Sequence, residues 1–373
     1  MRYCIVLFVA LLLRLPAVAQ SADDLNRLRH YASVIGTDSV CVSPDPLCLK
    51  LLFTEIVYGR KPRNVGFTGA PEHIDSVRIN RLTASFLRGG DWCPLLDSLE
   101  SKNQAYQLLK EYCMQCLTDD YMADSLTMAK IRETLNTYRW LNRFSTGQCI
   151  VVNLPSATLR VFDRSGKPVL SSRVIVGKPA TPTPLFTAVV TGIVMYPYWT
   201  IPKSILIREI LPAVRKNPLA QLEAMKLQVI DARGKPVDPA TVNWSVPATA
   251  FPYRLRQATG CDNALGLMKF NVNDPYDIYL HDTNARNLFA TANRFLSHGC
   301  IRVEKPVELA NQLLGKPAFT ASYMKACPAN AVPRTIPLPK TIPVVMTYNL
   351  IDLDEDGSIQ VYRDRYHLWQ TTL

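Results

Sequence analysis

The first third of the chain has the hydrophobic pattern of amphipathic helices. Leu109 and Cys113 stand four positions apart among polar and charged neighbours, and Ile131 and Leu135 repeat this spacing. Positions three or four apart lie on one face of an α-helix, so such a stretch buries one face and exposes the other. Residues 20–146 are therefore expected to form a helical scaffold domain.

The pattern changes at about Gly147 from helical spacing to the alternation of β-strands. Alternating segments are CIVVNLP, TLRVFDRSGKPVL and SRVIVG, followed later by FPYRLRQ, GLMKFNV and DIYLHDT. The residues from Arg164 to Lys167 have the composition of a hairpin turn. Residues 147–327 are expected to form a mostly β domain. The fold class that follows is α+β, with the helical domain first.

A helical, proline-flanked stretch, SILIREILPAVRKNP, interrupts these strands and predicts an insertion over residues 196–251. Such a segment is either a functional loop that covers a site or an ornament of the fold. Long loops in compact domains are more often functional, which favours the first interpretation. Further along, VELANQLLG predicts a helix that ends at Gly315.

Residues 328–373 contain two more strand-like segments, PVVMTYNLIDL and SIQVYRDRY, on either side of an acidic turn. Asp356 and Gly357 between alternating strands are typical of a hairpin turn. The acidic run also resembles a calcium loop. However, the twelfth position counted from Asp352 is Arg363, not the bidentate Glu that such a loop needs. We therefore expect a C-terminal β-hairpin extension without calcium.

The composition is that of a globular, exported protein. The 373 residues are 48% hydrophobic, enough to bury a core in about two domains. The first twenty residues combine Arg2, a short apolar run and Ala17-Val18-Ala19, as in a secretory signal that is cleaved after residue 19. No later segment has eighteen uninterrupted apolar residues. The mature protein is therefore not expected to be an integral membrane protein.

The net charge of +11 would suit an acidic partner. The basic residues are scattered along the chain, however, and an exported protein rarely meets nucleic acid. We therefore expect no nucleic-acid partner. The carboxylate-bearing cell wall, reached in the periplasm or cell envelope, is the expected partner.

One segment, YLHDTNARNLFATANRFLSHGCIR, combines the residue types of a cysteine nucleophile and its base. Fifteen residues separate His281 from the run Ser297-His298-Gly299-Cys300. A glycine beside the thiol lets a substrate carbonyl approach the backbone, and a histidine can take the thiol proton and hold a thiolate–imidazolium pair. The alternative is a buried cysteine with two core histidines. The coincidence of these residue types at this spacing favours the catalytic interpretation.

This segment resembles the signature of the L,D-transpeptidases of the YkuD family: His, fourteen to seventeen residues, Ser/Thr-His-Gly-Cys, a hydrophobic residue, then Asn or Arg. Ile301 and Arg302 fill the last two positions. The resemblance to larger two-domain members extends through GRKPRNVGFTG, YRWL, PYWTIPKSI, RQATGCDNALGLMKF, IYLHDT and IPVVMTYNL. It implies a YkuD-type catalytic domain, whose insertion is a lid over the active site, after a scaffold domain.

The resemblance also implies the reaction and the partners. A tetrapeptide stem of peptidoglycan is attacked at its diaminopimelate carbonyl, and the terminal D-Ala leaves. The amine of a second stem then resolves the thioester into a 3→3 cross-link. β-Lactams of the carbapenem class are expected to acylate the same thiol, and no cofactor is expected. Two alternatives stay open: an L,D-carboxypeptidase with water as acceptor, and a catalytically silent wall-binding scaffold.

Five residues are expected to carry the chemistry. Cys300 supplies the thiolate and His281 the base, while the backbone carbonyl of Asp282 orients that base, as in the family. His298 is expected to shape the loop by hydrogen bonding, because side chains on either side of one glycine rarely meet head-on. The amides of Gly299 and Cys300 are expected to form the oxyanion hole.

Four further residues are expected to contact the substrate. The planar guanidinium of Arg302 is suited to a substrate carboxylate. Tyr279 and Trp199 are candidates for the walls of the groove, and Ser297 for a contact beside the nucleophile. No set of residues with metal-ligand spacing accompanies them.

Eight cysteines remain once Cys4, in the signal, and Cys300 are set aside: Cys41, Cys48, Cys93, Cys113, Cys116, Cys149, Cys261 and Cys327. An even number in an exported protein indicates a partial disulfide framework of open connectivity. Cys113 and Cys116 form a C-x-x-C in a helical stretch with no preceding strand, which favours a structural bridge over a redox site. Cys261 departs from the family pattern, so it either pairs elsewhere or alters substrate contacts.

Overall fold

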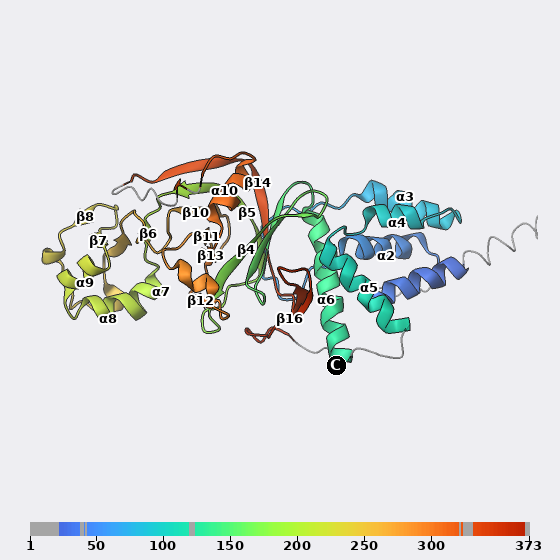
Figure 1. Ribbon diagram of the computed structural model, residues 1–373, viewed down its shortest axis with the longest axis horizontal. Coiled ribbons are helices and arrows are strands. Elements are labelled where there is room, and N and C mark those ends of the chain that lie inside the picture. Colours follow the sequence, from blue (N-terminus) through green and yellow to red (C-terminus); the bar gives the residue numbers. More distant parts are fainter. Residues whose placement is uncertain are drawn as a thin grey trace, which may run out of the picture. The chain divides into compact units, whose positions relative to one another are not determined.

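The computed structural model describes residues 22–37, 41, 43–118, 124–320, 322–323 and 331–369 (Figure 1). The expected signal segment, residues 1–19, lies outside this part. Within it, no helix is long and apolar enough to cross a membrane. The chain divides into two compact units: Met1–Ser171 with Pro184–Ala188 and Pro343–Leu373, and Ser172–Thr183 with Val189–Ile342. Helices begin the first unit and strands dominate the second, so the predicted α+β class is confirmed.

Residues 22–34 of the first unit are helical, and α2 (Pro46–Tyr58), α3 (Ser76–Leu87), α4 (Cys93–Leu99), α5 (Gln104–Thr118) and α6 (Ser125–Leu141) follow. The side chains of Asp45, Asp75 and Asp124 accept hydrogen bonds from first-turn amides of α2, α3 and α6. Each such cap is worth about 1 kcal/mol. The rings of Phe53 and Phe86 meet edge to face, 5.7 Å between centroids, in the core of this helical region.

The first unit also contains β1 (Phe67–Thr68), β2 (Cys149–Asn153), β3 (Thr158–Phe162) and the end of β14 (Arg334–Thr347). β2 pairs antiparallel with β3 and parallel with β14, with Val344 opposite Ile150. The C-terminal segment therefore extends the sheet that begins at β2.

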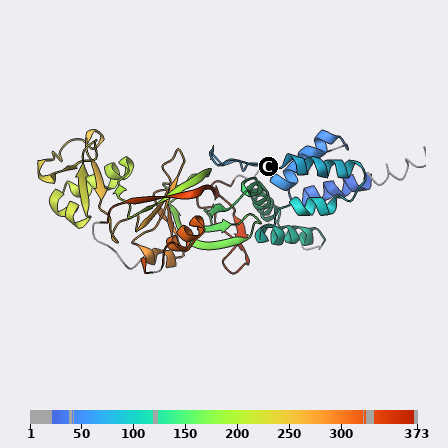
Figure 2. The ribbon, with the colours of Figure 1, turned by 90° about the horizontal axis from the view of Figure 1, so that it is seen from above.

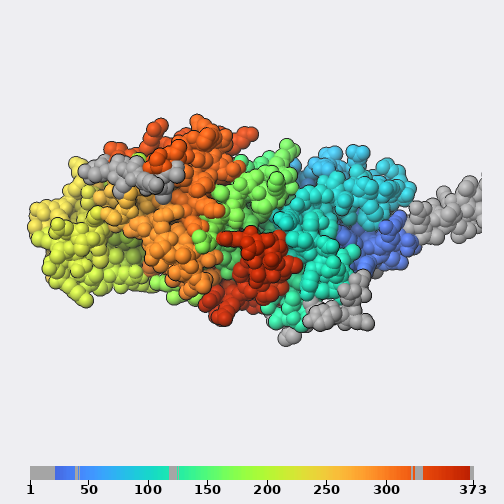
Figure 3. All heavy atoms as spheres, in the orientation of Figure 1, coloured from blue at the N-terminus to red at the C-terminus, as the bar shows by residue number. Residues whose placement is uncertain are grey.

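The C-terminal hairpin consists of β15 (Ile351–Leu353) and β16 (Ile359–Val361), which are antiparallel. Asp354 turns the chain by accepting hydrogen bonds from the amides of Asp356 and Ser358. The predicted hairpin is confirmed, although its first strand starts later than expected because β14 ends at Thr347. The hydroxyl of Thr134 on α6 donates to the carbonyl of Ile351 over 2.8 Å, and Figure 3 shows these C-terminal residues lying against α6.

The second unit contains the sheet that carries the expected site. Its strand order is β5 (Phe186–Met195), β10 (Met268–Val272), β11 (Leu280–His281), β13 (Ile301–Val303) and β4 (Pro168–Gly177); β4 and β5 also contribute residues to the first unit. The register aligns Phe270, Leu280 and Ile301, which are fully buried. Because side chains alternate along a strand, their neighbours face the other side of the sheet.

Two short elements flank the Cys300 turn. β12 (Phe295–Ser297) pairs with the end of β4. Helix α10 (Pro306–Leu314) ends at Gly315, whose φ of 66° is left-handed, so the predicted helix end is confirmed.

The insertion extends past its expected end at residue 251, because the segment FPYRLRQ, expected in the main β domain, supplies a strand of the insertion's own sheet. Its elements are β6 (Trp199–Thr200), α7 (Lys203–Ile205), a π-helix (Leu206–Ile210), α8 (Leu211–Val214), α9 (Pro218–Ala224), β7 (Leu227–Ile230), β8 (Pro236–Val237) and β9 (Arg254–Gln257). Its strands form a separate sheet in the order β6-β9-β7-β8, with the helices beside it (Figures 1 and 2). Leu211, Val214 and Leu255 lie in its own core. The hydrophobic pattern predicted the helices of this segment but not the sheet.

One disulfide joins Cys41 to Cys48. Cys261 is also disulfide-bonded, and its partner lies outside the described residues. The predicted bridge within the C-x-x-C is wrong, because Cys113 and Cys116 are free and buried in α5. They fill the apolar face of the helix as small hydrophobic side chains.

Candidate active site

Neighbouring strands bring the expected chemical groups to one face of the sheet. In the register, Lys269 of β10 lies opposite His281 of β11, and His281 lies opposite Arg302 of β13. Tyr279 and Cys300 stand two positions earlier on the same two chain segments, and the amide of Ile301 donates to the carbonyl of Tyr279. Paired residues share a face. His281 and Cys300, which are far apart in the sequence, therefore lie on the same face of the sheet, two positions apart along the paired strands.

A cavity of about 450 Å³ opens over this face. Its lining includes Cys300 and the two expected groove walls, Tyr279 and Trp199, together with Lys269 and Asp277. A cavity of this size is large enough for a peptide segment. It is the place where the thiol can meet a substrate.

His281 is 5% exposed, and its Nδ1 donates to the backbone carbonyl of Asp282 over 2.5 Å. This bond leaves the lone pair on Nε2. The pKa of His281 is lowered to about 3, chiefly by burial and also by the positive charges of Arg302 and Lys269, while the bond to Asp282 opposes them. The imidazole is therefore neutral at pH 7.

The Cys300 thiol points to different partners from those the sequence suggested. Its S–H donates to the carbonyl of Asp277 over 3.7 Å, and no hydrogen bond joins it to His281 among the described residues. The reason is the register, which places Cys300 beside Tyr279 and His281 beside Arg302. Burial raises the pKa of Cys300, whereas hydrogen bonds from Tyr279 and the charge of Lys269 lower it.

The loop that presents the thiol is braced by two buried hydroxyls. Ser297 accepts a hydrogen bond from the amide of Gly299 over 3.1 Å and donates to the carbonyl of Cys300 over 2.6 Å. Thr183 donates to the carbonyl of Gly299 over 2.7 Å and accepts from the amide of Gly177. Gly299 adopts a φ of +123°, which L side chains rarely adopt.

These contacts correct two expectations. Ser297 lies beneath the loop, with both hydrogen-bonding directions used, and not in the substrate groove. The Gly299 amide, expected in the oxyanion hole, donates to the hydroxyl of Ser297 in this structure. The amide of Cys300 has no partner among the described residues, so it remains available.

His298 also differs from its expected place. Its Nε2 donates to Glu209 of the π-helix in the insertion over 2.7 Å, and Lys178 lies 3.3 Å away. It therefore joins the loop to the insertion, and the brace expected of it comes from Ser297 and Thr183.

Of the remaining charged side chains at the site, Asp282 has partners within the protein and Arg302 can bind a ligand. The Asp282 carboxylate is held by Arg286 at 2.8 Å and by the amide of Leu267 at 2.9 Å. Arg302 is half-buried, and its side chain has no hydrogen bond or ion pair among the described residues. Its guanidinium is therefore available to a carboxylate.

We expect Thr183→Val to destabilise the protein by about 2–6 kcal/mol, because it removes two hydrogen bonds to buried backbone groups, at about 1–3 kcal/mol each, while keeping the side-chain shape. Urea unfolding measures this loss. Thr183→Ser keeps the hydroxyl and should lie much closer to wild type. Equal stability of Thr183→Val and wild type would contradict the bracing role.

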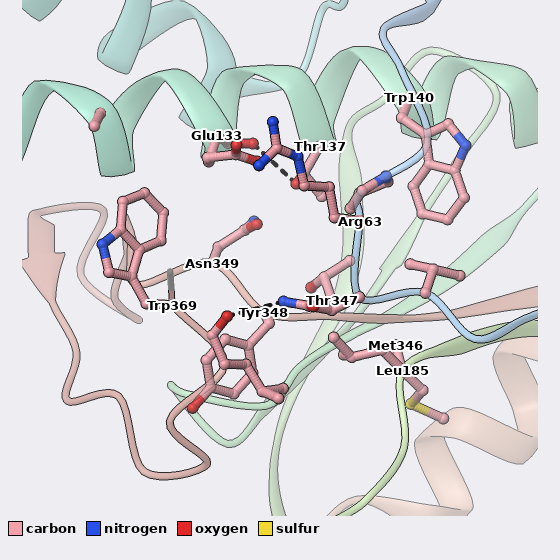
Figure 4. A pocket seen from close by; sticks show the side chains of 15 residues that line it. Arg63, Glu133, Thr137, Trp140, Leu185, Met346, Thr347, Tyr348, Asn349 and Trp369 are labelled. Carbon is pink, nitrogen blue, oxygen red and sulfur yellow. Dashed lines mark hydrogen bonds between the residues drawn. The ribbon is translucent and has the colours of Figure 1, made fainter. Parts of the chain in front are cut away.

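The first unit contains a separate cavity of about 160 Å³, shown in Figure 4. Arg63, Glu133, Trp140, Tyr348 and Trp369 are among its lining residues. Its lining in the described part of the chain includes no cysteine or histidine.

Comparison with known proteins identifies the family. Residues 147–345, more than half of the chain, match the model of the YkuD family, described as the L,D-transpeptidase catalytic domain. A Haemophilus influenzae protein named "Putative L,D-transpeptidase" is 38% identical over 217 residues, 58% of this chain. The chain spans 44% of that relative's length.

Similar solved structures include L,D-transpeptidase 3 from Mycobacterium tuberculosis (12% identity, TM-score 0.26, 54% of this chain and 61% of that chain). Another is an L,D-transpeptidase from Mycobacterium smegmatis (15% identity, TM-score 0.23, 54% and 58%). Scores this low carry no argument about the present chain. The match over residues 147–345 shows that the chain belongs to the YkuD family of L,D-transpeptidase catalytic domains.

Proposed function

We propose that the chain is an exported peptidoglycan L,D-transpeptidase that forms 3→3 cross-links through a thioester on Cys300. The observation that carries this proposal is a thiol at a cavity, on the same sheet face as a neutral, oriented His281 and as Arg302, whose guanidinium has no ion pair in the described part of the chain. These are a nucleophile, a base and a carboxylate anchor. The periplasm or cell envelope is the proposed location.

The first half-reaction cleaves the donor. The sulfur of Cys300 attacks the diaminopimelate carbonyl while Nε2 of His281 accepts the thiol proton. The amide of Cys300 and the hydroxyl of Tyr279 donate to the oxyanion, the second replacing the occupied Gly299 amide. Collapse breaks the amide bond, the imidazolium returns the proton to the leaving D-Ala amine, and the thioester remains.

The second half-reaction transfers the acyl group. The side-chain amine of another stem attacks the thioester, and His281 accepts a proton from it. Collapse then releases the sulfur, which takes that proton and restores the thiol. Arg302 binds a substrate carboxylate throughout. A carbapenem enters the same cycle because its strained lactam carbonyl can occupy the oxyanion site.

Mass spectrometry after incubation with disaccharide-tetrapeptide tests the function. Cross-linked dimers that have lost one D-Ala are expected, and none with Cys300→Ala. Tripeptide without dimer would instead show a carboxypeptidase with water as acceptor. Unchanged tetrapeptide would indicate a silent scaffold.

A further inference from the structure

Lys269 is a half-buried lysine, the second residue of strand β10. It lies opposite His281 in the register and lines the same cavity as Cys300. Its Nζ is 4.2 Å from the centroid of the Tyr279 ring, a cation–π contact. No carboxylate pairs with it among the described residues. Burial lowers its pKa, while the negative charges of Cys300 and Asp277 raise it.

The charges around the thiol come from three sides. β10 contributes Lys269, and β13 contributes Arg302. The loop between β10 and β11 contributes Asp274 and Asp277, and Asp274 raises the pKa of Cys300. The neutral imidazole of His281 adds no charge. Of the two cations, Lys269 is the one that lines the cavity beside the thiol.

We propose that the ammonium of Lys269, and not a protonated His281, is the positive charge that balances the Cys300 thiolate. This assignment rests on the proposed role of Cys300 as nucleophile. Lys269 stays protonated and transfers no proton. The thiol proton passes to solvent when the thiolate forms before attack, and to Nε2 of His281 when it forms during attack. Lys269 thereby favours the nucleophilic form, and His281 serves as proton acceptor without having to be charged beforehand.

The pH dependence of Cys300 alkylation by iodoacetamide tests the assignment, with peptide mass spectrometry as readout. Lys269→Met removes the charge but keeps the length of the side chain. It should raise the apparent pKa of the Cys300 thiol by about one unit, which lowers the alkylation rate below that pKa about tenfold. Lys269→Arg should retain the wild-type value. His281→Gln should also leave it nearly unchanged.

A second probe separates charge from packing. The ratio of the Cys300 alkylation rate with anionic iodoacetate to the rate with neutral iodoacetamide should fall several-fold in Lys269→Met. The same ratio should not change in Lys269→Arg. If Lys269→Met fails to fold, Lys269→Gln is titrated in its place. If the Cys300 pKa changes in His281→Gln but not in the Lys269 variants, the role of Lys269 would be overturned and the proposed function would stand. A wild-type Cys300 that resists alkylation at every pH would overturn the proposed function itself.

Discussion

A carbapenem is expected to add once to this protein and not at all to Cys300→Ala. The lactam carbonyl needs a thiolate, an oxyanion donor and a cavity together, and only Cys300 combines them among the described cysteines. Loss of a nucleophile typically lowers the rate by about 10⁴-fold or more. Intact-mass spectrometry measures the adduct directly.

Cys93 provides the matched control, because it is free and exposed but lies on helix α4 of the other unit. Cys93→Ala should leave the carbapenem adduct unchanged. A small alkylating agent should label both Cys93 and Cys300, whereas the free cysteines Cys113, Cys116 and Cys149 are buried. An adduct that persists in Cys300→Ala would place the nucleophile elsewhere.

Sequence patterns predicted those features of the candidate site that depend on residues close together in the chain. Ser297 to Cys300 form one turn, and the expected contact of His281 with the Asp282 carbonyl involves adjacent residues. Strand alternation also predicts that Tyr279 and His281 share a face. Local patterns of this kind survive folding because the backbone geometry of one strand or turn fixes them.

The sequence could not predict the contributions of distant segments. Thr183 reaches Gly299 across 116 positions, and Lys269 reaches the site only because β10 pairs with β11. The Gly299 amide donates to Ser297 in a turn where Gly299 has a φ of +123°, and the sequence does not show that angle. The sequence does show Lys269 between apolar residues of the strand-like segment GLMKFNV, which could have marked it as a candidate site residue. Register decides which face it occupies, and register is a tertiary property.

His281→Gln should lower the acylation rate by several orders of magnitude, because the thiol and the leaving amine both lose their proton carrier. His298→Gln should have a much smaller effect, within about tenfold, since His298 contacts Glu209 and not the thiol. Single-turnover acylation by a carbapenem, followed by mass spectrometry, compares the two variants. If His298→Gln is inactive while His281→Gln retains near wild-type rate, with both folded, the base assignment is wrong.

Stability against pH gives an independent measure of the same histidine. The pKa of His281 is lowered on folding, from 6.5 to about 3, so the unfolded chain binds the extra proton between these values. The stabilisation is complete above pH 6.5 and is lost as the pH falls towards 3. Between pH 7 and pH 4 this loss is roughly 3 kcal/mol. His281→Gln cannot bind that proton, so urea unfolding at the two pH values should show a drop smaller by about this amount. An equal drop in both proteins would mean that the pKa of His281 is not lowered on folding, contrary to the burial seen in the structure.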